Sequence, residues 1–124
     1  MKKIKVVLVE PMKEARIVEI GSELEDMQKL VGGYIEALPL ENEVSIVCNE
    51  EAKLEGLKPN RGIFRDGQLV DIICGTFFVC ATPWDSVNFE SLTDEQATRI
   101  ASTYKSPEMF FFRGRNLTCH KIGG

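Results

Sequence analysis

The hydrophobic and polar positions of this chain fall into short runs with two different periods. Residues 4–9 form a nearly continuous apolar run rich in β-branched side chains, which predicts a central β-strand. Asp66-Gly67, between two apolar runs, is the strongest short signal for a β-hairpin. The same patterns predict further strands at 16–20, 34–40, 44–48, 62–65, 68–73 and 76–81.

Two segments have the spacing of an amphipathic helix. Ser22 and Glu25 form a capping-box pattern, which predicts a helix that begins at Ser22 and ends at Gly32-Gly33. Thr93 and Gln96 repeat the pattern and predict a second helix. The apolar stripes are Leu24, Met27, Leu30 and Val31 in the first helix, and Ala97, Ile100, Ala101 and Tyr104 in the second.

This order of elements predicts an α+β fold, with a mainly antiparallel sheet and two helices on one face. Residues 1–106 are expected to form a single domain. Residues 107–124 are expected to be a C-terminal extension that adds an edge strand and a flexible tail.

Composition and charge limit the kinds of partner and the cellular location that we expect for this protein. The chain has 124 residues, 44% of them hydrophobic, and a formal charge of −4. This mild acidity argues against nucleic acid as a partner. The charge is uneven, because the last 20 residues are net basic, with Lys105, Arg113, Arg115 and Lys121 against Glu108. No run has the length of a membrane span or the form of a signal peptide, so we expect a cytoplasmic protein with reduced cysteines.

The sequence offers little for catalysis, and we expect no enzyme activity, no metal and no cofactor. No pair of cysteines has the two-residue gap of a zinc or redox motif. His120 is the only histidine, and its neighbour Cys119 lies on the same terminal segment, where an activated geometry is rare.

The polar connection NEEAKLEGLKPNR, residues 49–61, is the best candidate for a site. It joins two runs that must be buried, and its Asn and Arg side chains carry paired donors and acceptors. Arg61 has the planar fork that suits phosphate or carboxylate, and Lys53 adds a point charge. The alternative is structural, with Arg61 paired to Glu50 or Asp71 so that it pins the loop.

Three consecutive phenylalanines mark the C-terminal segment. On a strand, Phe110 and Phe112 would face one way and Phe111 the other. One interpretation is therefore a partner surface or a contact between copies of this chain. The other is a strand packed on both sides.

Three blocks, LVGGYIEALPL, IVCNEEAKLEGLKPNR and DIICGTFFV, occur in this order. In them the chain resembles an uncharacterised domain-of-unknown-function family, common in phages, plasmids and conjugative elements of Gram-positive bacteria. The resemblance covers residues 4–104, leaves the tail outside, and implies no particular activity. The family's recurrent polar positions correspond to Tyr34, Glu36, Asn49, Glu50, Lys53, Asn60, Arg61, Asp71 and Thr76.

With the resemblance, the polar loop is best interpreted as functional. Our first hypothesis is a binding module of a mobile element that captures a phosphorylated, nucleotide-type defence signal. Arg61 and Lys53 would hold phosphate, Asn49 and Asn60 would bind base or ribose, and Tyr34 would stack. The full ligand-binding set is Tyr34, Asn49, Glu50, Lys53, Asn60, Arg61 and Thr76.

The second hypothesis is an inhibitor that binds a host defence protein. It would use an acidic face and the edge formed by Phe110, Phe111 and Phe112. An enzyme is the weakest interpretation, because no pair of nucleophile and base can be named.

Overall fold

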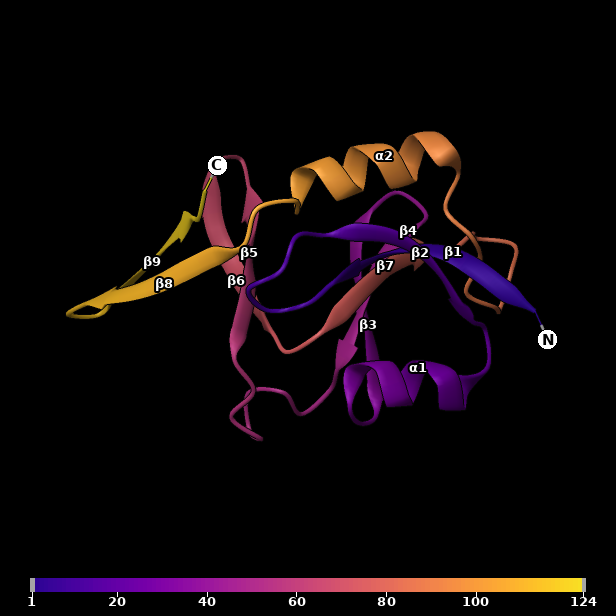
Figure 1. Ribbon diagram of the computed structural model, residues 1–124, viewed down its shortest axis with the longest axis horizontal. Coiled ribbons are helices and arrows are strands. Elements are labelled where there is room, and N and C mark those ends of the chain that lie inside the picture. The colour runs from indigo at the N-terminus through magenta and orange to yellow at the C-terminus, as the bar shows by residue number, and fades with distance from the viewer. Residues whose placement is uncertain (1, 124) are drawn as a thin grey trace.

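A computed structural model describes residues 2–123, apart from the side chains of Phe112 and Arg113. Its centre is an antiparallel sheet of five strands in the order β2-β1-β7-β4-β3 (Figure 1). The apolar run predicted to be a central strand, residues 4–9, lies inside this sheet as β1, which pairs with β2 and β7. The strands are β1 (Lys3–Val9), β2 (Arg16–Gly21), β3 (Ile35–Glu41), β4 (Val44–Asn49) and β7 (Phe77–Ala81).

The helices α1 (Leu24–Val31) and α2 (Asp94–Thr103) lie on opposite sides of this sheet. Their buried residues fall into two separate cores, which take alternate residues of the same strands. The core under α2 contains Val7 and Val9, and the core under α1 contains Val6 and Leu8. The α+β class with antiparallel strands and two helices is therefore confirmed, but the placement of both helices on one face is wrong. A central strand that is apolar on both faces needs a cover on each side.

The two capping predictions have different outcomes. Thr93 caps α2 with both hydrogen bonds of the capping box, as its pattern predicts. The N-cap of α1 is Glu23, without a side-chain cap, so the prediction for Ser22 is wrong. The Ser22 hydroxyl instead donates to the carbonyl of Lys2, 3.3 Å away. Gly32 ends α1 in the left-handed conformation with φ of 82°, which confirms the predicted helix end.

A separate hairpin of β5 (Pro59–Arg65) and β6 (Gln68–Cys74) turns at Asp66-Gly67, as predicted. It packs on the same face of the central sheet as α2, since Ile63 and Ile73 belong to that core. Strand β5 begins earlier than residue 62, so it includes Asn60 and Arg61. This early start draws both side chains out of the expected loop and into the interior.

The C-terminal extension forms a second hairpin, β8 (Glu108–Arg113) and β9 (Asn116–Lys121). Because β8 pairs only with β9, it is not an edge strand of the central sheet. The hairpin approaches β5 at Gly62, where an added Cβ would lie 2.8 Å from the Cys119 sulfur. Within residues 2–123, neither helix has the length and apolar character needed to cross a membrane.

Candidate functional site

A cleft of about 180 Å³ opens beside the polar loop that follows β4. Its walls come from β3, the end of β4, the loop and β6, four segments that lie apart in the sequence. The tertiary fold therefore gathers polar residues that no local pattern joins. The ionisable residues that line the cleft are Glu36, Cys48, Glu50, Glu51, Lys53, Asp71 and Cys74.

One ion pair crosses this cleft between the loop and β6. The Lys53 ammonium donates to the Asp71 carboxylate over 2.9 Å, and both side chains are partly exposed. This hydrogen bond raises the pKa of Lys53, while burial opposes the rise. Glu36 and Glu50 form no side-chain hydrogen bond or ion pair with any residue of the described chain. The cleft thus holds carboxylates with free acceptor atoms, and Lys53 is the one positive charge among its lining residues.

Two thiols lie at the wall of the cleft and are not nucleophiles at neutral pH. Burial raises the pKa of Cys48 to about 11, and the nearby Glu36 and Asp71 carboxylates raise it further than Lys53 lowers it. Burial also raises the pKa of Cys74. Both groups are therefore protonated thiols near pH 7, where the attacking species would have to be a thiolate.

Asn49 organises the loop from within. Its amide nitrogen donates to the carbonyl of Val31 at 3.3 Å and to the Glu55 carboxylate at 3.0 Å. Its side-chain oxygen accepts from the backbone N–H of Glu51 at 2.8 Å. Only 4% of Asn49 is exposed, so its amide shapes the cleft and is not free for a ligand, which corrects its predicted role.

Asn60 and Arg61 are structural residues and lie outside the cleft. Asn60 donates to the carbonyls of Val9 and Gly75, and Arg61 donates to those of Tyr104 at 3.1 Å and Lys13 at 2.6 Å. Arg61 also donates to the side-chain oxygen of Asn60 at 2.8 Å. Neither side chain is more than 1% exposed, so the predicted contacts to phosphate, base and ribose are wrong.

The structural alternative for Arg61 was right about its purpose and wrong about its partners. The Arg61 guanidinium donates to backbone carbonyls and not to the carboxylates of Glu50 or Asp71. Burial lowers the pKa of its guanidinium, and the Glu108 carboxylate acts in the opposite direction. A guanidinium keeps its charge throughout the accessible pH range, so this is a buried, charged crosslink between loops.

Tyr34 and Thr76 lie in other depressions. Tyr34 is exposed in a hollow of about 250 Å³ that shares Asn49 and Glu51 with the cleft and therefore adjoins it. Thr76 lines a hollow of about 330 Å³ with Lys29 and Lys58 and does not join the cleft. The predicted residues that the cleft does unite are Asn49, Glu50 and Lys53. Glu36 and Asp71, which the family resemblance marked as recurrent polar positions, also line it.

Phe110 and Phe111 of β8 face different surfaces, as predicted. Phe110 lines an apolar groove of about 500 Å³ between the β5–β6 and β8–β9 hairpins. Phe111 points to the outer face, where it is 43% exposed and its ring centroid is 5.7 Å from that of His120. The side chain of Phe112 lies outside the described part of the molecule.

The fold and the cleft define a small α+β domain with an acidic, loop-bounded cavity. A family model described as a domain of unknown function, DUF3846, matches residues 4–105, and the chain belongs to this family. Searches of curated proteins and of solved structures found no match. The match contains every residue of the cleft and stops before the C-terminal hairpin. Within residues 2–123, no group of three or more His, Cys, Asp or Glu side chains is placed to hold a metal ion.

Proposed function

We propose that this protein binds a small polar molecule in the cleft between the polar loop and β6. The observation that carries the proposal is the convergence of Glu36 from β3, Glu50 and Lys53 from the polar loop, and Asp71 from β6. Packing needs none of these side chains, because all four are at least partly exposed. Convergent polar groups at the wall of a concave site are the usual means of orienting a ligand.

The chemistry of the lining favours a ligand that presents hydrogen-bond donors. Ionised carboxylates only accept hydrogen bonds, so Glu36 and Glu50 suit amino groups, ribose hydroxyls or a positively charged amine. Phosphate has little support, since Arg61 is buried and Lys53 is already paired with Asp71. The ligand class is therefore donor-rich, such as the base and ribose of a nucleoside-type signal.

Capture without conversion fits the chemistry of this cleft. With a pKa of about 11, the Cys48 thiol is a poor nucleophile at neutral pH. We propose that the protein serves a phage or conjugative element of Gram-positive bacteria and sequesters a signal of host defence. This biological setting rests on the family resemblance of the three sequence blocks.

Native mass spectrometry tests the proposal on the full chain. The protein is incubated with extract from phage-infected cells, and a ligand is expected as an added mass of a few hundred daltons. Glu36→Gln removes one charged acceptor and should weaken binding about 10- to 100-fold, since a hydrogen bond to a charged group contributes about 1.5–3 kcal/mol.

Glu19→Gln is the matched control, because Glu19 is also an exposed glutamate on an edge strand of the same sheet. It makes the same change of charge at the far edge and should leave binding unchanged. Equal loss in both variants, or a bound mass retained in Glu36→Gln at wild-type affinity, would exclude the cleft as the site.

A second candidate function is inhibition of a host protein through the outer face of the C-terminal hairpin. Met109 and Phe111 stand there with 47% and 43% of their surfaces exposed. Two large apolar side chains on one exposed strand are typical of a binding surface. This proposal predicts a stable complex in pull-downs that Phe111→Ser abolishes and that needs no small molecule.

A further inference from the structure

The connection between β7 and α2, residues 82–92, carries two of the three most exposed large apolar side chains in the described chain. Trp84 is 84% exposed and Val87 is fully exposed. We call these two side chains the Trp84 knob. The segment lies at one end of the long axis of the molecule, and the β8–β9 hairpin lies at the other (Figure 1).

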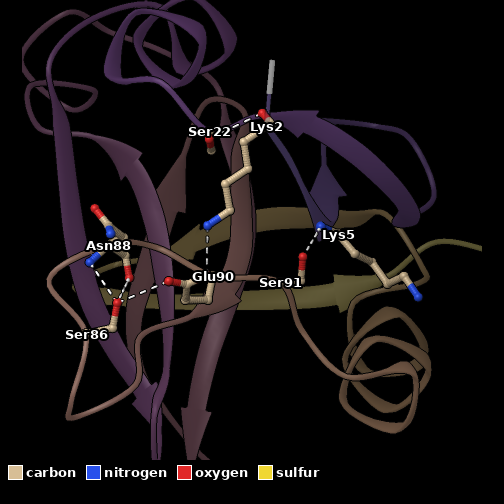
Figure 2. Close-up of polar contacts among 7 residues, drawn as sticks. All are labelled: Lys2, Lys5, Ser22, Ser86, Asn88, Glu90 and Ser91. Carbon is tan, nitrogen blue, oxygen red and sulfur yellow. Dashed lines mark hydrogen bonds and ion pairs between the residues drawn. The ribbon is translucent and has the colours of Figure 1, made fainter.

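The knob is held on a rigid polar frame, part of which Figure 2 shows. The Ser86 hydroxyl accepts from the backbone N–H of Asn88 and lies 3.1 Å from the Glu90 carboxylate. Glu90 in turn accepts from the Lys2 ammonium at 3.3 Å. Ser91 accepts from the backbone N–H of Lys5 at 2.9 Å, which fastens the segment to β1. A segment that these hydrogen bonds already hold in place loses little conformational entropy when it binds a partner.

The Trp84 side chain is already oriented. Its indole N–H donates to the Asn42 side chain at 3.2 Å, and its backbone N–H donates to the Glu43 carboxylate at 3.2 Å. The polar atoms are therefore satisfied, and the ring faces remain open to solvent. Trp is one of the residue types enriched among the anchors of protein interfaces.

The opposite end of the molecule offers a matching receptor, the apolar groove between the two hairpins. Its volume of about 500 Å³ lies within the range of pockets that hold large organic groups. We call it the hairpin groove, and Val70 on its wall is 53% exposed. Its apolar lining is Pro59, Leu69, Val70, Ile72, Phe110 and Leu117.

The two ends also carry opposite charge. Segment 82–92 has no Lys or Arg, and although Lys2 pairs with Glu90, the carboxylates of Asp85 and the neighbouring Glu43 remain. The hairpin carries Arg113, Arg115 and Lys121, while Glu108, its acidic residue, is buried. Charge complementarity therefore adds to apolar complementarity, and it favours the encounter of one end with the other.

The geometry points to head-to-tail self-association, in which the Trp84 knob of one copy docks into the hairpin groove of the next. The knob cannot reach the groove of its own chain, because they lie at opposite ends. The two surfaces differ, so the contact is heterologous and builds rings or open chains. The docked knob would border the ligand cleft, since groove and cleft share Lys53 and Asp71.

Sedimentation velocity on the full chain tests this between about 1 µM and about 1 mM. The mass is expected to rise above the 13.9 kDa of one chain as concentration increases. Trp84 is the only tryptophan, so its emission should move to shorter wavelength over the same concentrations. A mass of one chain and an unchanged emission across the series would overturn the inference.

Two variants locate the contact. Trp84→Ala removes the tryptophan of the knob, and Val70→Glu places a bulky negative charge in the groove, where it also repels Asp85 in segment 82–92. Both positions are exposed, so both variants should fold, as shown by an unchanged urea midpoint. Each should remain a single chain at every concentration. Leu24→Ser, at a 56% exposed leucine on α1, is the control and should associate like the parent.

A mixture of the two variants distinguishes this contact from any symmetric one. Trp84→Ala keeps an intact groove and Val70→Glu keeps an intact knob, so an equimolar mixture can form one contact and no more. The expected product is a complex of two chains that does not grow further. A mixture that stays monomeric, or self-association by either variant alone, would refute the head-to-tail arrangement. No ligand is present in these experiments, so their failure leaves the proposed function untouched.

Discussion

The carboxylate of Glu108 accepts a 2.8 Å hydrogen bond from the backbone N–H of Gly62, and this contact joins the C-terminal hairpin to β5. Glu108 is 6% exposed, and the buried guanidinium of Arg61 is near enough to feel its charge. The hairpin lies outside the family match, but its anchor residues on β5 lie inside it. The extension is thus built onto the most interior part of the domain.

Arg61→Met should destabilise the protein by about 3–5 kcal/mol, because it leaves the buried or partly buried carbonyls of Lys13, Asn60 and Tyr104 without their donor. Arg65→Met on the same strand is the control, since Arg65 is exposed and makes a single 3.4 Å hydrogen bond. That change should cost no more than about 0.5 kcal/mol. Urea denaturation measures both values, and similar midpoints for the two variants would contradict a structural role for Arg61.

The ion pair between Glu41 and Arg99 should make a pH-dependent contribution to stability. Arg99 donates to both carboxylate oxygens of Glu41, at 2.7 and 2.8 Å, and this hydrogen bonding lowers the pKa of Glu41 in the folded state. A lowered folded-state pKa stabilises above the unfolded value and is lost as the pH falls through the folded value.

Glu41→Gln should therefore reduce the free energy of unfolding at pH 7, by no more than about 1 kcal/mol because both side chains are well exposed. The difference from the parent should shrink as the pH is lowered below the ordinary glutamate pKa of 4.5. Urea midpoints of both proteins at pH 7 and pH 3 measure the effect. A deficit of the same size at both values would show that the charge pair is not its cause.

The two helix N-termini should respond differently to loss of a hydroxyl. Thr93→Ala removes the cap of α2 and should cost about 1 kcal/mol. Ser22→Ala should cost less than about 0.5 kcal/mol, because Ser22 does not cap α1. Thermal unfolding of the two variants gives the comparison, and equal losses would indicate that Ser22 caps its helix after all.

Cys48 and Cys80 should resist alkylation in the native protein. Burial raises the pKa of Cys80 to about 12 and that of Cys48 to about 11, and neither residue is more than 5% exposed. Mass spectrometry after maleimide treatment at pH 8 should find both unlabelled without denaturant and labelled in urea. Rapid native labelling of Cys48 would mean that the cleft wall opens readily.

The local signals of the sequence were reliable where neighbouring residues complete the interaction. The hairpin at Asp66-Gly67, the end of α1 at Gly32 and the cap of α2 at Thr93 all involve partners within a few residues. Ser22 had the same pattern as Thr93, but its hydroxyl donates a hydrogen bond to the carbonyl of Lys2, which is distant along the chain. A side chain in a capping pattern can therefore form its hydrogen bond with a distant residue and leave the helix end uncapped.

The candidate site was only partly predictable for the same reason. The sequence marked the polar loop, and three of the residues predicted to bind a ligand, Asn49, Glu50 and Lys53, do line the cleft. Whether Arg61 would meet a ligand or the protein interior depended on where β5 begins. No sequence pattern indicated that Trp84 would stand exposed on a hydrogen-bonded frame, since its partners Asn42 and Glu43 lie on another turn.

The sequence by itself determined the α+β class, most strand positions and the turns, because hydrophobic period and turn chemistry are local properties. Only the tertiary structure decided which faces the helices cover, which polar side chains are buried and which converge on the cleft. Those outcomes depend on pairing between distant strands. An arginine can bind a ligand at the surface or crosslink loops in the interior, and its sequence neighbours do not decide between the two. Arg61 is a crosslink in the interior, because its guanidinium is buried and donates to carbonyls that would otherwise lack a donor.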